Sequence, residues 1–285
     1  MRKAGILLPI TALPSKYGIG GFTKEAYEFV DFLEKSGQSY WQILPMGPTS
    51  FGDSPYQSFS AFAGNPYYIS LEELVKEGLL TSKECEAVDF GGDERNINYK
   101  RIYETRIKLL KTAYKKADLN GNQEYLDFIG ENVKWLEDYA LFMALKDYYG
   151  GLPWYEWDYE IKVSNPKAKE EAQQRLWKEA EFYKFVQFYF FKQWNALKEY
   201  ANEKGVKIMG DIPIYVAYDS ADVWAESALF QLDTDKTPIA VAGCPPDGFS
   251  KSGQLWGNPL YKWEIHKESG FLWWITAFCT MLRQR

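Results

Sequence analysis

Histidine is nearly absent from this sequence: His266 is the only one in 285 residues. This scarcity excludes a metal site built from several histidines. It also argues against a Ser-His-Asp triad, because the segment around His266, KWEIHKESG, is polar and typical of a loop. We therefore expect His266 to lie on the surface. Cysteine is scarce too, and Cys85, Cys244 and Cys279 are widely spaced without a CxxC pair, which predicts neither a zinc site nor a disulfide framework.

The sequence also lacks an excess of basic over acidic residues, and it lacks long apolar runs. The net charge is −6 and the isoelectric point is near 5.1. A nucleic-acid footprint needs a basic face, so we expect no nucleic-acid partner, and a polyanionic substrate is disfavoured. No run approaches the roughly 20 apolar residues of a membrane helix. Pro9 and Pro14 interrupt the N-terminal run, and no small-residue cleavage site follows. We expect a cytoplasmic, reduced and soluble protein with no membrane partner.

Aromatic residues, in contrast, are abundant, at 18% of the chain. Two interpretations compete: a core rich in large rings, or a site that binds the flat C–H faces of sugars. The stretch 52–70, GDSPYQSFSAFAGNPYYIS, sharpens the question. Its Gly, Ser and Pro residues are typical of a loop, and loops lie at the surface, so we expect its rings to be exposed. Tyr68 is the exception: it follows Asn-Pro and precedes a helix start at Ser70, so we expect it to pack.

The order of the apolar segments predicts an α/β fold. A brief apolar run at 4–14, a helical pattern at 23–37 and a second apolar run at 40–46 form a βαβ unit, which indicates a parallel sheet. Helical, charged segments dominate from about 71 to 180. A long ring-rich helix then leads to a third strand within 206–217. We predict a first βαβ unit with a ring-rich loop at 1–66, a mostly helical insertion at 67–180 and a continuation of the sheet with a further loop at 181–285.

Three loop segments carry residues that suit a neutral, hydroxylated ligand. They are GDSPYQS with Asp53 and Tyr56, GDIPIYVAYDSADVW with Asp211 and Asp219, and GCPPDGFSKSGQLWGNPLYKW. Carboxylates and amides hydrogen-bond sugar hydroxyls, and rings stack on the apolar face of a sugar. Each loop alone is weak evidence for a binding site, since an Asp beside Gly is more often a turn former. The candidates in the third loop are Asp247, Phe249, Ser250, Gln254, Trp256 and Asn258.

At this level of detail the sequence resembles a known family. ALPSKYGIGGF, QILPMGPTSFGDSPYQSFSAFAGNPYYISLEEL, GDIPIYVAYDSADVWA and PPDGFSKSGQLWGNPLYKW are similar to segments of the amylomaltases, the 4-α-glucanotransferases of glycoside hydrolase family 77 in the α-amylase clan. The resemblance runs from about residue 4 to about Ile275. It implies a (β/α)₈ barrel with helical insertions, and it implies retaining transfer of α-1,4-glucan segments to the 4-hydroxyl of glucose or of another glucan.

The resemblance also implies roles for particular residues. Tyr56 would be the stacking platform under the sugar at the cleavage point, and Asp211 would organise the same subsite. Asp247, Phe249 and Trp256 match a flexible loop over the bound sugars, and Asn258 falls in the same motif. The family needs no cofactor. The implied partners are α-1,4-glucans, maltooligosaccharides and glucose, and no metal is expected.

The sequence departs from the family pattern at its C-terminal end. After GFLWWI, family members continue to a strand with RIDHF, whose aspartate is the nucleophile, whereas this sequence reads TAFCTMLRQR. We therefore assign no catalytic nucleophile or acid/base residue, and we expect a truncated form without activity. The alternative is a noncatalytic glucan-binding remnant. A third interpretation, an α-glucan hydrolase of the clan, is disfavoured by GQLWGNPLYKW and GDIPIYVAYDSADVW.

Overall fold

The computed structural model describes residues 2–49, 53–91, 93 and 96–282. The chain forms two compact units, each assembled from three segments. The first unit comprises Met1–Met46, Gly64–Asn132 and Lys184–Asp211, and the second comprises Gly47–Ala63, Val133–Tyr183 and Ile212–Arg285. The predicted ranges 1–66, 67–180 and 181–285 follow the order of elements along the chain rather than these units, and they stay a prediction.

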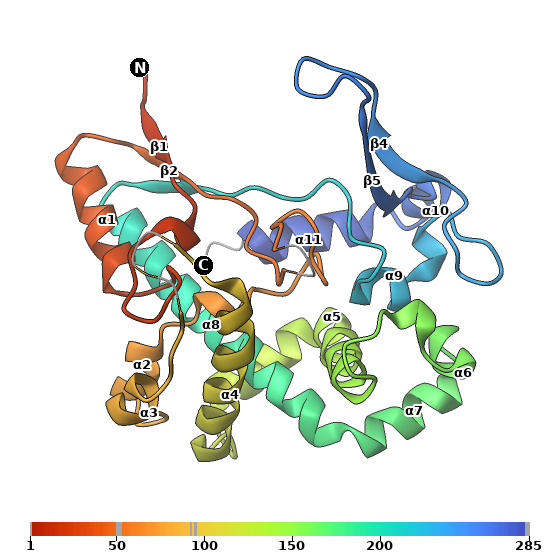
Figure 1. The fold of residues 1–285 in the computed structure, drawn as a ribbon, viewed down its shortest axis with the longest axis horizontal. Helices are drawn as coiled ribbons and strands as arrows, with labels where there is room; N and C mark the ends of the chain where they lie inside the picture. Colours follow the sequence, from red (N-terminus) through yellow and green to blue (C-terminus); the bar gives the residue numbers. More distant parts are fainter. Residues whose placement is uncertain (1, 50–52, 92, 94–95, 283–285) are drawn as a thin grey trace. The chain divides into compact units, whose positions relative to one another are not determined.

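The first unit contains a three-stranded parallel sheet in the order β1-β2-β3. Strand β1 (Gly5–Leu7) pairs with β2 (Tyr40–Gln42), which pairs with β3 (Lys207–Met209). Helix α1 (Lys24–Lys35) lies between β1 and β2 in the chain (Figure 1). The predicted βαβ unit is therefore confirmed, and the third predicted strand joins it as the neighbour of β2.

The strands are shorter than the apolar runs that predicted them. Each has three residues. Pro9 follows β1 closely, Pro45 follows β2 and Pro213 follows β3. Proline has no backbone N–H to donate to a neighbouring strand, and it disfavours the extension of a central strand. The chain accordingly leaves the sheet near each proline, and Pro9 precedes a 3₁₀ turn at Ile10–Ala12.

Helix α1 illustrates how local sequence sets the helix ends. Thr23 occupies its N-cap position in an extended conformation, as predicted, but its hydroxyl donates to the Glu25 carboxylate and caps no backbone N–H. Gly37 follows the helix with a φ of +67°, in the left-handed region that glycine adopts without a Cβ penalty. Ala26, Val30 and Leu33 are buried at helical spacing. The other helices of this unit are η2 (Pro66–Tyr68), α2 (Leu71–Lys76), α3 (Ser82–Glu86) and α4 (Tyr99–Lys116).

Two long helices contribute residues to both units, namely α5 (Gln123–Tyr148) and α8 (Trp177–Glu203). The long ring-rich helix predicted from the sequence is confirmed as α8. Among the described residues, no helix combines the length and the apolar character needed to cross a membrane.

Polar side chains hold the segment 64–70 in the core of the first unit. Gln187 accepts from Gly64 N at 2.7 Å and donates to Gly64 O at 2.9 Å. Gln193 makes the same pair of bonds with Ser70, at 2.7 and 3.3 Å. The buried guanidinium of Arg106 donates to the carbonyls of Tyr67 and Ile69, each at 2.7 Å. These side chains satisfy backbone groups that no neighbouring strand pairs, as buried polar groups require.

This arrangement corrects the expectation that the rings of residues 52–70 lie at the surface. Phe62, Tyr67 and Tyr68 are 6%, 7% and 5% exposed. Phe59 is half-buried, and Tyr56 is 45% exposed. The prediction was wrong for Phe62 and Tyr67, because side chains distant in sequence satisfy the loop backbone and the loop can be buried. The predicted packing of Tyr68 is confirmed. Of the five rings, Tyr56 is the one that the structure leaves substantially in solvent.

The second unit combines short helices with an antiparallel hairpin. The hairpin pairs β4 (Val241–Cys244) with β5 (Gln254–Pro259), and Figure 1 shows the two strands running side by side to their connecting loop. Besides parts of α5 and α8, the unit contains η3 (Trp154–Glu156), α6 (Tyr159–Lys162), α7 (Pro166–Arg175), α9 (Ala221–Ala225), η4 (Ser227–Leu229), α10 (Trp263–Glu268) and α11 (Leu272–Leu282).

His266 is buried, contrary to the prediction of a surface residue. Its exposure is 0%, and the segment expected to be a loop forms α10. Trp263 and His266 are three residues apart and share one helix face, where the imidazole contacts the rings of Tyr261 and Trp263 at centroid distances of 5.3 and 5.6 Å. Burial lowers the pKa of His266, which favours the neutral imidazole.

Candidate functional site

Tyr56 lies in a tight turn of the second unit. Gln57 N donates to Ser54 O at 3.1 Å, which closes a turn over Ser54–Gln57 with Pro55 at its second position. Proline suits that position because its φ is fixed near the value that the turn requires. Thr49 and Ser58 form an antiparallel bridge on either side of this loop. The local sequence therefore fixes the backbone under Tyr56, while its ring is 45% exposed.

The loop between β4 and β5 presents Asp247 and Phe249. The Asp247 carboxylate accepts from the backbone N–H groups of Phe249 and Ser250, at 2.9 and 2.8 Å, and this shapes the turn. Gly253 closes the loop with a φ of +73°, and a Cβ there would lie 2.5 Å from Cys244 O. The Phe249 side chain is 99% exposed, so its ring has no packing role in this conformation.

Trp256 and Asn258 lie on strand β5, and hydrogen bonds join this strand to the turn that carries Tyr56. Gln57 Nε2 donates to Asn258 Oδ1 at 3.1 Å and to the carbonyl of Trp256 at 3.4 Å. Asn258 Nδ2 donates to Val216 O at 2.8 Å. The Asn258 side chain is thus committed to the protein and is only 3% exposed, whereas Trp256 is 39% exposed.

A row of rings continues from Trp256 into the protein. The centroid of Tyr215 lies 6.3 Å from that of Trp256. On its other side Tyr215 stacks on Tyr261, with a centroid distance of 5.9 Å and an interplanar angle of 11°. Tyr261 is 2% exposed. The partly exposed Trp256 ring is therefore backed by half-buried and then buried rings, which restricts its motion.

Asp211 belongs to the first unit. It comes two residues after β3 and is half-buried. This agrees with the prediction of a carboxylate just beyond the carboxyl end of a parallel strand, the usual location of binding residues in α/β sheets. The other predicted ligand-binding residues, Tyr56, Asp247, Phe249, Trp256 and Asn258, belong to the second unit.

Asp219, another acidic residue of the same sequence segment, has a structural partner. Its carboxylate accepts from Lys146 Nζ at 2.6 Å and from Trp154 N at 3.2 Å. The Lys146 side chain is only 8% exposed, and its ammonium also lies 4.9 Å from the centroid of Phe59. The pair joins α5 to the segment before α9. Asp53, by contrast, has an exposed side chain and a φ of +55°.

Two residues that sequence reasoning missed connect the predicted ones. Gln57 was part of the quoted SPYQS motif, but nothing in the sequence indicated its partners on β5, about 200 residues away. Tyr215 was part of GDIPIYVA and looked like a strand residue. Their adjacency to Tyr56 and Asp211 in sequence was the one signal available.

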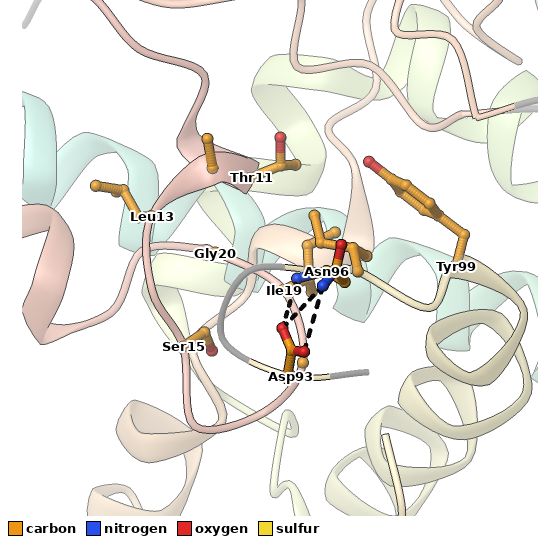
Figure 2. Close-up of a pocket in the computed structure, with 11 residues that line it drawn as sticks. Thr11, Leu13, Ser15, Ile19, Gly20, Asp93, Asn96 and Tyr99 are labelled. Carbon is orange, nitrogen blue, oxygen red and sulfur yellow. Dashed lines mark hydrogen bonds between the residues drawn. The ribbon is translucent and has the colours of Figure 1, made fainter. Parts of the chain in front are cut away.

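A cavity of about 580 Å³ lies in the first unit (Figure 2). It is lined by residues of the segment 11–20, with Leu13 and Ile19 as the large side chains, and by Asp93, Asn96, Ile97 and Tyr99. Figure 2 shows the Asn96 amide hydrogen-bonded to the Asp93 carboxylate, at 3.1 Å for the shorter contact. None of the predicted sugar-binding residues lines this cavity, so the volume alone does not identify the site. In the part of the chain that the structure describes, no group of three His, Cys, Asp or Glu side chains could hold a metal ion.

Comparison with known proteins gives a consistent result. A family model described as 4-alpha-glucanotransferase matches residues 8–284. Curated proteins named 4-alpha-glucanotransferase are similar over 96% of this chain, including one from Clostridium butyricum at 48% identity and one from Aquifex aeolicus at 49%. The chain spans about half the length of these relatives, 56% in both cases.

Solved structures extend this similarity to three dimensions. The amylomaltase from Streptococcus agalactiae in complex with acarbose is similar with a TM-score of 0.93 and 46% identity, covering 97% of this chain and 56% of that chain. The amylomaltase from Corynebacterium glutamicum is similar in fold, with a TM-score of 0.73 at 20% identity over 98% of this chain and 39% of that chain.

Proposed function

Because the chain belongs to the 4-alpha-glucanotransferase family, glycoside hydrolase family 77, we propose that its second unit binds an α-1,4-glucan between the Tyr56 turn and the β4–β5 hairpin. One observation carries this proposal: Gln57 joins the turn to the strand that bears Trp256, through bonds of 3.1 and 3.4 Å. Two partly exposed rings are thereby held on connected backbone, as stacking on a sugar requires.

The proposal gives each predicted residue a role. Tyr56 and Trp256 stack on sugar faces, and Phe249 closes over the chain from the hairpin tip. Asp247 hydrogen-bonds sugar hydroxyls with the carboxylate capacity that its turn leaves, and Asp211 organises the subsite at the cleavage point. Asn258 acts indirectly, because its amide is buried against Gln57 and Val216. We infer that it positions the rings and does not itself contact the glucan.

We further propose that the three parallel strands form the N-terminal part of a (β/α)₈ barrel. In this proposal the whole protein is a retaining 4-α-glucanotransferase. Its substrates are α-1,4-glucans and maltooligosaccharides, its acceptors include glucose, and it works in the cytoplasm. Retention uses two carboxyl groups about 5–5.5 Å apart and an oxocarbenium-like transition state. A π face such as Tyr56 stabilises the positive charge of that state by roughly 0.5–2 kcal/mol, depending on desolvation.

The 285-residue polypeptide contains no Arg-x-Asp-His sequence. We propose that these residues by themselves bind glucan without transferring it. The alternative role, a glucan-binding protein without catalysis, makes the same prediction for this polypeptide. The two roles can be distinguished in a longer chain that carries the same motifs together with the nucleophile strand. Transfer of glucan segments by such a chain would support the 4-α-glucanotransferase role.

The test combines binding with turnover. Maltoheptaose is titrated into the 285-residue polypeptide while tryptophan fluorescence is recorded, and Trp256→Ala should abolish most of the saturable response. Trp177→Ala is the matched control, because Trp177 is also exposed, at 56%, but lies outside the proposed site. Incubation with maltotriose should give neither glucose nor longer oligomers. Equal binding by the Trp256→Ala variant would contradict the site, and steady product formation would contradict the missing chemistry.

A further inference from the structure

A second cavity, of about 210 Å³, lies within the second unit and includes none of the residues proposed to bind glucan. It is bounded by the segment Ser60–Phe62, by helix α5, by α9 with the residues that follow it, and by the start of α11. Its volume equals roughly seven waters at about 30 Å³ each, so it suits a ligand of similar size rather than an oligosaccharide.

One carboxyl group lies deep in this cavity. Asp222 is 5% exposed, and its Oδ2 accepts from Ala61 N at 2.9 Å. Burial raises the pKa of this carboxyl to about 7, while the N–H groups of Ala61 and of Asp222 itself and the indole of Trp273 oppose the rise. The two oxygens of an ionised carboxyl offer about four acceptor positions, so capacity remains for a further donor.

Aromatic rings form the walls. Phe62 and Trp135 are 6% and 8% exposed, and they stack with a centroid distance of 6.1 Å and an interplanar angle of 13°. Trp273 meets Phe62 edge to face at 5.7 Å and 86°. Phe62, Trp135 and Trp273 all line the cavity, so its walls are rich in aromatic rings, and aromatic rings attract cations.

The remaining polar groups of the lining are mostly hydrogen-bond acceptors. Ser269 and Thr276 direct their hydroxyl hydrogens to the carbonyls of His266 and Leu272, at 2.9 and 2.8 Å, which leaves their oxygens as acceptors. Glu226 adds an exposed carboxylate.

Asp138 is the third carboxyl group of the described lining after Asp222 and Glu226, and its oxygen lies 2.8 Å from Lys169 Nζ. Lys134 is the one cationic side chain of the lining described, and it is exposed. Three carboxyl groups of the described lining therefore face one cationic side chain.

We propose that this cavity binds a small organic ammonium compound, with its cationic nitrogen at Asp222 and its apolar body between Phe62, Trp135 and Trp273. The three ring walls supply apolar contact and cation–π attraction. The carboxyl groups supply charge and hydrogen-bond acceptors. An anion would meet carboxyl groups of its own sign, and above about pH 7 a neutral ligand would leave the charge of ionised Asp222 uncompensated. The site is independent of the glucan-binding proposal.

Three isosteric probes test the role of charge. Benzylammonium, benzyl alcohol and benzoate are titrated separately into the 285-residue polypeptide by calorimetry. Benzylammonium should bind saturably and at least tenfold more tightly than benzyl alcohol, and benzoate should not bind. Equal affinity for the alcohol and the ammonium, or no saturable binding of the ammonium, would overturn the proposal.

Substitution tests the assignment of the nitrogen to Asp222. Asp222→Asn keeps an oxygen that can accept from Ala61 N, and it should weaken benzylammonium binding at least tenfold. Glu160→Gln is the matched control, because Glu160 is an exposed acid on α6, in the same unit. Unchanged affinity in Asp222→Asn would overturn the assignment. Phe62→Leu provides a second variant, which should weaken the ammonium more than the alcohol.

The pH dependence gives a readout that does not need a variant. Asp222 shares the cavity lining with Glu226 and with Asp138 and Lys134 from α5, and Tyr261 interacts with it electrostatically. Lys169 from α7 is paired with Asp138. Benzylammonium stays protonated between pH 6 and 8, so its affinity should rise over that range as Asp222 ionises. A flat or falling profile would contradict a cation at this carboxyl. Maltoheptaose affinity, measured in parallel, should not follow the same profile.

Discussion

Replacing Asn258 by alanine tests the connection on which the glucan site depends. The side chain makes three bonds: it donates to Val216 O at 2.8 Å and to Gln57 Oε1 at 3.5 Å, and it accepts from Gln57 Nε2 at 3.1 Å. It is 3% exposed, and Val216 is 4% exposed, so water cannot replace the lost partner of the carbonyl without a local rearrangement. Asn258→Ala therefore removes these three bonds, the one at 3.5 Å being the weakest, and leaves the buried Val216 carbonyl unsatisfied.

The expected magnitude follows from these contacts. A neutral hydrogen bond contributes about 0.5–1.5 kcal/mol net, and a buried unsatisfied group costs about 1–3 kcal/mol. Asn258→Ala should lower the free energy of unfolding by about 2–4 kcal/mol. Gln57→Ala should cost less, about 1–2 kcal/mol, because Gln57 is only half-buried and leaves Asn258 bound to Val216.

A double-mutant cycle measures the bond itself. Urea unfolding of the two single variants and of the double variant should give a coupling of about 1 kcal/mol, because both single variants lose the same bond. Maltoheptaose affinity should fall roughly tenfold in each single variant, which corresponds to about 1.4 kcal/mol. Asn202→Ala is the control, since Asn202 is exposed near the end of α8, and it should stay within about 0.5 kcal/mol of the wild type.

Two results would refute this reasoning. A loss below about 0.5 kcal/mol in Asn258→Ala would mean that the amide is not a buried, committed partner. A coupling near zero would mean that Gln57 and Asn258 act independently. If stability falls as expected but maltoheptaose binding stays normal, the connection is structural and the rings of the glucan site lie elsewhere.

Four further predictions follow from single side chains. Tyr56→Ala should weaken maltoheptaose binding with little change in melting temperature. Tyr68→Ala, at a ring only 5% exposed, should lower the free energy of unfolding in urea by about 3–5 kcal/mol. The reverse pattern would contradict the assignment of Tyr56 as the residue that stacks on the sugar. Phe249→Ala should leave unfolding within about 0.5 kcal/mol of the wild type, since the ring is 99% exposed, and should reduce glucan affinity in calorimetry. Asp219→Ala should lower the free energy of unfolding in urea by about 2–4 kcal/mol, because it leaves the Lys146 ammonium, on a side chain 8% exposed, without its carboxylate partner. Glu171→Ala, at a side chain 68% exposed, should lower it by under about 0.5 kcal/mol. Equal losses would contradict the structural role of Asp219. The pKa of Asp222 is about 7 in the folded state, above that of a free carboxyl, so the folded state binds an extra proton and the contribution of this carboxyl to stability falls as pH rises from about 4 to 7. Between pH 5 and pH 8, the free energy of unfolding should therefore decline less in Asp222→Asn than in the wild type. An identical decline in both proteins would exclude Asp222 as its source.

Local periodicity predicted the elements whose formation depends on near neighbours. The βαβ unit with α1 and the long helix α8 appear where apolar spacing, caps and glycine placed them. Proline positions could have shortened the predicted strands, because proline disfavours the interior of a central strand. Tyr56, Phe249 and Trp256 are also exposed to the extent that a binding role requires.

Burial determined by distant partners was beyond the reach of sequence patterns. The rings near Gly64–Ser70 are buried because Arg106, Gln187 and Gln193 satisfy that backbone, and a glutamine in a helix gives no sign of such a partner. The bond between Gln57 and Asn258 spans 201 residues. His266 seemed a surface residue because its neighbours are polar, yet one face of α10 packs it among rings.

The interleaved segments of the two units constrain the order in which a ribosome can complete them. Strand β2 ends at Gln42, but its second neighbour begins at Lys207, so 165 residue positions separate the two. Synthesis at about 5–20 residues per second delays β3 by roughly 10–30 s after β2 has been made. During that interval the edge of β2 that β3 later covers lacks its partner. Nascent chains of this protein should therefore depend on chaperones until residue 211, the last of the first unit, has left the exit tunnel.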